Sequence, residues 1–596
     1  MHLCNGGGRT VPCRLGSLLL SCGMLLTGCP QSERALRTAP PSPSPSETAH
    51  RGGPILKVSG QVTLDSLDPG VMYQDESFFV ARGVFRTLVT YLTDSKGVTE
   101  LVPDLATDLG SSNDDLTRWT FELKEGVRFG LAVGGRDVPG VTGREVTSSD
   151  VKYAFERAFL PAVANDYTFY YENLVGLDAF IDGDAAEVRG IRTPDERTIV
   201  FNLTRPAGDF PHRLTLPISS PVPESLAQRF DLRKRSSYAR HAVATGPYYV
   251  ESYRPGSHIR LRRNPHWSIR TDGVRKARLG GMSWSLNLPE RRGLEAILAG
   301  KQHLVLDDPL TNLSLELAAA DRSRRARVRI EPNQCVRYIW LNTTVAPFDD
   351  VRVRRALNLA VDRYLIRRAF GGGVMGEIPG SVLQPGVAGH LPRTTYQPFA
   401  TRGDAGDPER ARRALTGTKA EKGWDDPVVV LAGSSPASAI GADLVIAALR
   451  RLGFANIKLR LGSLADYSRP RAKVAVGPSA GWCGDYLDAF SSLFPLFHGD
   501  RIRPRHNENF AQLDDPELNR LIDRGGALHV GPERAEAWAD ANRRATDLAP
   551  WVPWLWENSR FIVSSRLRDA IYEPHFQQID WTRARLREAA AREAEE

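Results

Sequence analysis

The chain has 596 residues, of which 41% are apolar and 25% are charged. With a mean hydropathy of −0.32, this composition excludes a polytopic membrane protein, a disordered chain, a collagen-like fibre and a disulfide-dense miniprotein. The net charge of +8 leaves nucleic acid or an anionic membrane surface open as partners. The arginines are scattered among 70 acidic residues, however, which is typical of solvated helix faces. We therefore expect no nucleic-acid partner.

The N-terminus has the pattern of an export signal. Two arginines precede an apolar run over residues 15–26, which is too short to span a bilayer, so residues 1–28 are predicted to be a signal peptide. The letters LTGC at its end resemble the bacterial lipobox, and Cys29 is therefore the expected lipidation site. The alternative is an ordinary signal peptide with an incidental Cys29. Residues 29–54 are rich in proline and serine and predict an extended linker to the membrane.

Two cysteines remain once the signal is removed and Cys29 is acylated. Cys335 and Cys483 lie in a large exported body, which indicates one structural disulfide. Two separately buried thiols are the alternative. No histidines cluster at ligand spacing near either cysteine, so no metal site is expected.

Strand-like runs alternate with helical stretches after residue 54, which predicts an α/β fold. Residues 118–123 place alternate apolar side chains on one face, and residues 198–203 repeat that pattern, so both are predicted strands. Between them, residues 150–159 are apolar at helical spacing, with Ser149 or Asp150 as the expected helix cap.

The second half of the chain contains the clearest helical pattern. Residues 351–370 carry an apolar stripe preceded by two aspartates, which predicts one long helix. Further on, residues 427–431, 437–452 and 456–461 read as strand, helix and strand. This order predicts a βαβ unit with parallel strands.

Sequence motifs for catalysis are missing. The chain has no HExxH and no Walker A motif, and it has no GxSxG or GxGxxG at a junction from a strand to a helix. We therefore expect a binding protein that is not an enzyme. The enzyme alternative is a secreted α/β hydrolase, whose nearest nucleophile candidates, Ser434 and Ser435, lack the flanking glycines of that motif.

A series of motifs follows in order along the chain. They are SLDP (66–69), VPDLATDL (102–109), WTFELKEGVRF (119–129), GREVTSSDVKYAFERA (143–158), DERTIVFNLTRP (195–206), TGPYYV (245–250), RRNPHW (262–267), LNTTVAPFDDVRVRRALNLAVDR (341–363) and GWCGDYLDAF (481–490). Together these motifs resemble one family, the extracellular solute-binding proteins of ABC importers, family 5, in its oligopeptide/dipeptide-binding group. In that family the strand motif is followed directly by the helix motif, whereas here about a dozen residues, 131–142, lie between them, so a loop is expected to be enlarged.

The resemblance implies an α/β, two-lobe periplasmic-binding-protein-like fold of type II, in the large class with an extra subdomain. Two hinge crossovers would join the lobes. Lobe I would comprise residues 55–93, 216–333 and 552–596, the last including a C-terminal tail. The extra subdomain would comprise residues 94–215, and lobe II residues 334–551.

The resemblance also implies a ligand site. In peptide-binding relatives the aspartate of a W-x-x-D-Y pattern pairs with the α-ammonium of the ligand, which assigns that role to Asp485. The alternative is that Asp485 caps a helix or bonds within its loop. Trp482 and Tyr486 would be walls of the cleft. Tyr73 would join them from residues 70–74, where some oligopeptide binders offer a second carboxylate.

Oligopeptide-binding members of the family can carry a disulfide between the two motifs that hold Cys335 and Cys483. The implied function is capture of oligopeptides or dipeptides by hinge closure, without a cofactor, and their delivery to an ABC permease and ATPase on separate chains. The protein would be a monomer, lipid-anchored to the outer face of the bacterial cell membrane. A sugar, opine, antibiotic or similar solute is the alternative ligand, because fold alone does not fix ligand.

Overall fold

The structure is a computed structural model that describes residues 53–232, 234–306, 312–433, 436–462, 473–504 and 507–587. The predicted signal peptide, Cys29 and nearly all of the linker lie outside these residues, as do Ser434 and Ser435. Helices and strands alternate along the described chain, which confirms the predicted α/β class.

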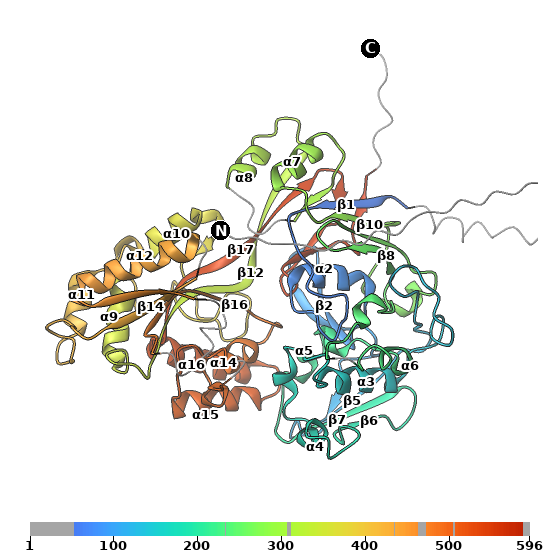
Figure 1. The fold of residues 1–596 in the computed structure, drawn as a ribbon, viewed down its shortest axis with the longest axis horizontal. Coiled ribbons are helices and arrows are strands. Elements are labelled where there is room, and N and C mark those ends of the chain that lie inside the picture. Colours follow the sequence, from blue (N-terminus) through green and yellow to red (C-terminus); the bar gives the residue numbers. More distant parts are fainter. Residues whose placement is uncertain are drawn as a thin grey trace, which may run out of the picture. The chain divides into compact units, whose positions relative to one another are not determined.

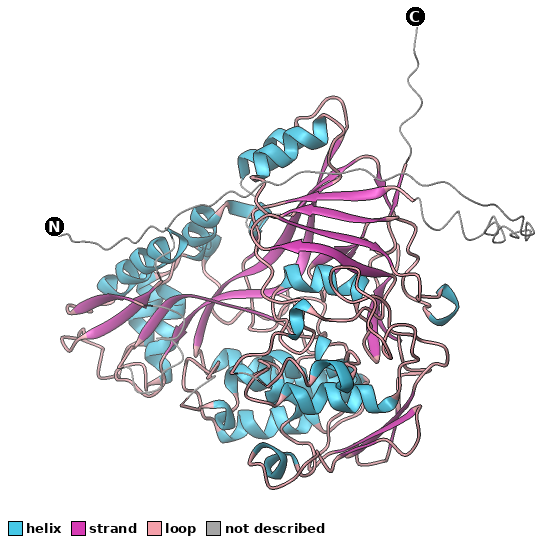
Figure 2. Ribbon diagram, turned by 45° about the vertical axis from the view of Figure 1, so that its right-hand side comes forward, coloured by secondary structure: helices cyan, strands magenta, loops and turns pink. Residues whose placement is uncertain are grey.

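A mixed sheet of eleven strands forms the frame of the molecule, and Figure 2 shows its strands in magenta. Their order is β15-β14-β16-β12-β17-β11-β1-β10-β9-β8, with β13 also paired to β17. The strands are β1 (Ile55–Ser59), β8 (Tyr248–Arg254), β9 (His258–Arg263), β10 (Gly281–Ser285), β11 (Leu304–Val305), β12 (Ala326–Leu341), β13 (Gly376–Glu377), β14 (Val428–Ala432), β15 (Ile457–Leu461), β16 (Val476–Cys483) and β17 (Trp551–Ser564).

Strands β12 and β17 are the two crossovers (Figure 1). The first part of β12 pairs with the end of β17 next to β11, whereas its last residues pair with the start of β17 next to β16. Strand β12 therefore runs from lobe I, which holds β1 and β8–β11, into lobe II, which holds β14–β16, and the antiparallel β17 runs back from lobe II into lobe I. Their register shifts between Pro332 and Val336, where they pass from one lobe to the other. The two-lobe fold with two crossovers is confirmed, and the boundaries of its parts stay a prediction.

Lobe II contains the predicted βαβ unit. Strands β14 and β15 are parallel neighbours, with Val428 opposite Ile457, and α12 (Pro436–Arg451) connects them. Gly453 follows the helix at a φ of +89°, a backbone conformation that favours glycine and ends the helix.

The single helix predicted over residues 351–370 is wrong, because the chain forms α9 (Val351–Ala360) and α10 (Arg363–Phe370). Asp350 caps α9, as its position predicts. Val361 is extended, and the carboxylate of Asp362 accepts the backbone N–H of Leu365 at 2.8 Å. A second cap inside the apolar pattern therefore starts a new helix.

A separate four-stranded antiparallel sheet, the small sheet, has the order β4-β5-β7-β6. It contains the two strands predicted from alternation, and α3 packs on it through Phe155, whose ring lies 5.2 Å from that of Phe201. The cap of α3 is Thr147, and Asp150 completes the capping box as its third residue, which corrects the predicted cap. The elements are β4 (Ser111–Ser112), β5 (Arg118–Glu122), β6 (Ile191–Arg192), β7 (Thr198–Asn202) and α3 (Ser148–Ala158).

The remaining elements connect and cover these sheets. The helices among them are α2 (Asp75–Val84), α4 (Leu177–Ile181), α5 (Phe210–Arg213), α6 (Glu224–Ala227), α7 (Glu290–Leu298), α8 (Asn312–Ala319), α11 (Pro408–Ala414), α14 (Phe490–Phe497), α15 (Pro516–Gly526) and α16 (Pro532–Asp547), with short 3₁₀ turns that include η1 (Thr168–Tyr171) and η7 (Gly499–Arg501). The strands are β2 (Val89–Thr93), β3 (Thr99–Pro103), β18 (Leu567–Arg568), β19 (Ile571–Glu573), β20 (Gln578–Asp580) and β21 (Arg585–Leu586).

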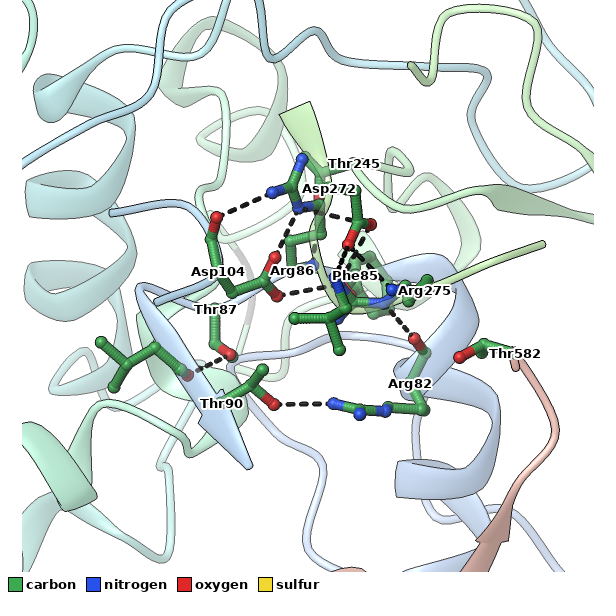
Figure 3. A network of polar contacts seen from close by, with 12 residues as sticks. Arg82, Phe85, Arg86, Thr87, Thr90, Asp104, Thr245, Asp272, Arg275 and Thr582 are labelled. Carbon is green, nitrogen blue, oxygen red and sulfur yellow. Dashed lines mark hydrogen bonds and ion pairs between the residues drawn. The ribbon is translucent and has the colours of Figure 1, made fainter. Parts of the chain in front are cut away.

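A buried network of charged side chains joins the segment that follows α2 to two later segments of the chain (Figure 3). The Asp104 carboxylate binds Arg86 at 2.7 Å and Arg275 at 2.9 Å, and Arg275 also contacts Asp272 at 3.2 Å. Burial opposes ionisation of Asp272, but the charges of Arg275 and Arg86 outweigh it and hold its pKa below the ordinary value. Since an unpaired buried charge is costly, the four side chains hold this part of lobe I in one arrangement.

Candidate functional site

A cavity of about 110 Å³ lies where the two lobes meet. Asp75 and Glu76 of α2 line it from lobe I, and Arg337 and Cys483 line it from β12 and β16. The crossover strand β17 contributes residues 557–561. A molecule bound here would therefore contact both lobes and the crossovers at once, as expected for a ligand whose binding is coupled to lobe closure.

A disulfide fixes the strand that leads into the site. Cys335 of β12 and Cys483 of β16 are directly paired across the two strands, and their sulfur atoms are 2.01 Å apart. Both cysteines line the cavity. The N–H of Gly484 then donates to the carbonyl of Gln334 at 2.8 Å, so the chain turns away from the sheet directly after the disulfide.

Asp485 is the first side chain after this turn, and it reaches across to the region of the small sheet. The hydroxyl of Tyr170, in η1, donates to its Oδ2 at 2.5 Å. The same hydroxyl lies 3.1 Å from the carbonyl oxygen of Ser491. Within the described residues, Asp485 is therefore held by one hydrogen bond from a distant segment, and that bond engages one of its two carboxylate oxygens.

The surroundings of Asp485 disfavour a negative charge. Desolvation raises the pKa of Asp485 to about 7. The hydrogen bond from Tyr170 lowers it in part, while the charges of Glu508 and Asp166 raise it further. Desolvation also raises the pKa of Glu508, opposed by Arg501. Because the charges of Glu508 and Asp166 raise the pKa of Asp485, a positively charged group bound beside this carboxylate would be stabilised.

Tyr73 lies in the same region as Asp485. Its ring stacks on Tyr167 with 5.2 Å between centroids, and 41% of Tyr73 is exposed. Desolvation of the phenol raises its pKa, and the charge of Asp485 is the next largest cause, followed by Glu508 and Asp166. The structure therefore brings two residues that the sequence assigned to the site, Tyr73 and Asp485, within electrostatic reach of each other.

Trp482 and Tyr486 are packed more tightly than walls of an open cleft. They are 7% and 1% exposed. The indole N–H of Trp482 donates to the carbonyl of Ser491 at 3.1 Å. The hydroxyl of Tyr486 donates to Oδ2 of Asp209 at 2.6 Å, and its ring meets the ring of Tyr170 edge to face. In this structure, both side chains support the segment that carries Asp485.

The sequence did not identify Tyr170, which binds Asp485 across the site. It also did not identify Glu172, two residues further on, which binds Arg503 through two contacts of 2.6 and 2.9 Å and Arg501 at 3.3 Å. The aromatic run Tyr167–Tyr171, between a helix and a strand, was the available signal. Its partners lie more than 300 residues away, which local periodicity does not show.

The described residues hold no group of three or more histidines, cysteines, aspartates or glutamates placed to bind a metal ion. Their helices all fall short of the length and apolarity that crossing a membrane requires.

Comparisons with known proteins bear on the family and the fold of this chain. The model of the bacterial extracellular solute-binding proteins, family 5, matches residues 100–503. The "Probable D,D-dipeptide-binding periplasmic protein DdpA" of Escherichia coli K12 is 24% identical over 556 residues, which are 89% of this chain and 94% of that protein. "Heme-binding protein A" of Haemophilus influenzae is 24% identical over 572 residues, 93% of this chain and 96% of that protein.

A solved structure gives the same relationship in three dimensions. The "Clavulanic acid biosynthesis oligopeptide binding protein 2" superimposes with a TM-score of 0.79 at 28% sequence identity. The match covers 90% of this chain and 96% of that one.

Proposed function

Because the chain belongs to the bacterial extracellular solute-binding proteins, family 5, we propose that it captures dipeptides or oligopeptides between its lobes and presents them to a membrane permease. Two relatives support the proposal, since one is named for dipeptide binding and the other for oligopeptide binding. The permease and its ATPase would be separate chains, and the binding protein would act as a monomer that catalyses no reaction.

One observation carries the proposal. Asp485 is a desolvated carboxylate with a pKa raised to about 7, and it lies two residues beyond a cavity that both lobes line. An ammonium group that meets this carboxylate would supply the positive charge that its surroundings lack. The α-ammonium of a peptide is such a group. Main-chain contacts to the rest of the peptide would leave its side chains free to vary.

Native mass spectrometry of protein purified without denaturation tests the proposal by identifying bound solute. A mixed library of dipeptides to pentapeptides should then raise the unfolding temperature saturably. A ligand at roughly one hundred times its Kd stabilises by about 3 kcal/mol. Recovery of only a sugar, haem or another non-peptide solute would replace the peptide by that ligand, and conversion of a bound compound to product would favour the hydrolase alternative.

We propose further that Cys29 carries the membrane anchor. Two acyl chains on one residue hold a protein stably at a bilayer, whereas one chain binds only marginally. Cys29→Ser should therefore release the protein from the membrane fraction into the medium, and wild type should incorporate radiolabelled fatty acid. Absence of label in the wild type would contradict the anchor without affecting the proposed ligand.

A further inference from the structure

A second, larger cavity of about 1180 Å³ is bordered by the β2–β3 turn, strand β12 and strands β18 and β19. Its lining contains seven cationic side chains and three acidic ones, an excess of four positive charges. The lysines are Lys96 and Lys276. The arginines are Arg278, Arg327, Arg329, Arg568 and Arg583. No motif of the sequence and no part of the proposed peptide site accounts for this concentration of charge.

The three acidic side chains of this basic cavity already have partners. The Asp94 carboxylate accepts two backbone N–H groups of its own turn, at 2.7 and 2.9 Å. Asp569 pairs with Arg278 at 2.7 Å, and Glu331 with Arg329 at 2.9 Å. The other five cationic side chains of the cavity form no ion pair with any described carboxylate.

Two of the three arginines among these five side chains, Arg327 and Arg568, lie within electrostatic reach of each other. Arg327 donates to the carbonyl oxygen of Leu567 at 3.1 Å, beside Arg568. Desolvation, together with the charges of Arg568 and Arg329, lowers the pKa of Arg327. Like charges held this closely cost free energy that a bound anion would recover.

We propose that this basic cavity binds a ligand that carries more than one phosphate group, with Arg327 and Arg568 as its central contacts. The planar guanidinium binds phosphate oxygens through two parallel hydrogen bonds, and an excess of four charges suits a multiply charged anion. The phosphates could belong to a free polyphosphate anion or to the headgroups of an anionic bilayer. The proposal does not depend on peptide binding.

Calorimetric titration with inorganic tripolyphosphate tests the cavity. The full chain is used, with Cys29→Ser in every sample so that no acyl group attaches it to lipid. We expect saturable binding that weakens as salt is added. Replacing Arg327 and Arg568 together by Gln should weaken it by about ten- to a hundredfold, because two charge-assisted contacts are lost. Arg413→Gln with Arg450→Gln, which removes equal charge from exposed positions on α11 and α12, should leave the affinity unchanged.

Co-sedimentation with vesicles distinguishes the two sources of phosphate. Binding to mixed phosphatidylcholine and phosphatidylglycerol vesicles, but not to phosphatidylcholine alone, with competition by tripolyphosphate, assigns the cavity to a bilayer surface. Tripolyphosphate binding without vesicle binding assigns it to a free anion. If the arginine variant melts far below wild type, Lys96→Gln with Lys276→Gln, both exposed, replaces it. Wild type that binds neither probe, or cavity variants that bind like wild type, would overturn the proposal.

Discussion

Asp485 is the residue on which the account of ligand binding depends most. Its carboxylate accepts one hydrogen bond, from Tyr170, and its pKa is raised to about 7 by desolvation and then by neighbouring negative charge. An ionised carboxylate in such a place lowers the stability of the ligand-free protein. The same property makes Asp485 an effective partner for a cation, because a bound cation removes the energetic cost of the ionised carboxylate.

The stability of the ligand-free protein should therefore increase when Asp485 is neutralised. The pKa of Asp485 is 3.8 in the unfolded chain and about 7 in the folded protein, so between these pH values only the folded state keeps the proton. The free energy of unfolding therefore falls as the pH rises from about 4 toward 7. At pH 8, Asp485→Asn should raise the unfolding free energy by on the order of 1–3 kcal/mol, less than the full shift because solvent reaches part of the side chain. Denaturant unfolding at pH 8 and pH 5 checks this, and the gain should shrink at the lower pH. A less stable variant at pH 8 would contradict the pKa assigned to Asp485.

Peptide affinity should fall as the solution is acidified. The α-ammonium needs the ionised form of Asp485, which is protonated below a pKa of about 7. Between pH 7.5 and pH 5.5 the affinity should decrease by about an order of magnitude, while the peptide ammonium stays charged. Calorimetry in buffers of different ionisation enthalpy should also detect proton release on binding. In Asp485→Asn the pH dependence should be much weaker, and an equal dependence in both proteins would assign it to another group.

The short element η1 connects the ligand site to a contact between η1 and η7, which are more than 300 residues apart in the chain. Tyr170 of η1 binds Asp485, and Glu172, which follows η1, binds Arg501 of η7 and Arg503 just beyond it. Arg501 has a side chain only 3% exposed, and its guanidinium lies over the ring of Phe169. These pairs exist only while η1 and η7 are in contact, so they stabilise the contact between these two segments.

Glu172→Gln should therefore speed ligand dissociation without removing a ligand contact. Loss of the ion pairs of Glu172 with Arg503 and Arg501 should raise the rate of ligand dissociation by roughly three- to tenfold, equivalent to about 1 kcal/mol. The association rate should change little. Stopped-flow dissociation of a bound fluorescent peptide measures this. Glu122→Gln is the matched control, because the exposed pair of Glu122 with Arg197 lies within the region of the small sheet. Unchanged dissociation in Glu172→Gln, or an equal change in the control, would contradict the role of this contact.

At the scale of elements, the sequence predicted what local pattern determines. The alternation in β5 and β7 and the βαβ unit of lobe II were confirmed because each depends on neighbours in the chain. The break at Val361 and Asp362 was missed, because it lies inside an unbroken apolar stripe and no glycine or proline marks it. The capping box of α3 shows the same limit, since Thr147 acts through Asp150 three residues later.

At the scale of the whole molecule, the two-lobe fold was predicted from the family resemblance and is confirmed. The path of its long strands could not be predicted from the sequence. Strand β12 has 16 residues and changes partner along its length, which only tertiary pairing reveals. Asp485 and Tyr73 were assigned to the site from motifs, and the structure places them near each other. Tyr170 and Glu172 were missed because their partners lie in distant segments.

The central claim is that the Asp485 carboxylate meets the α-ammonium of a bound peptide, and a double-mutant-style cycle of affinities tests it directly. Wild type and Asp485→Asn are each titrated with the tightest library peptide, with its amine free or N-acetylated. In wild type, acetylation should weaken binding by about 30-fold to several thousand-fold, because it leaves the buried carboxylate without its cation. In Asp485→Asn the loss of affinity on acetylation should be far smaller, since the peptide ammonium has no carboxylate to pair with at position 485 in that variant. An equal loss in both proteins would show that Asp485 does not contact the amine.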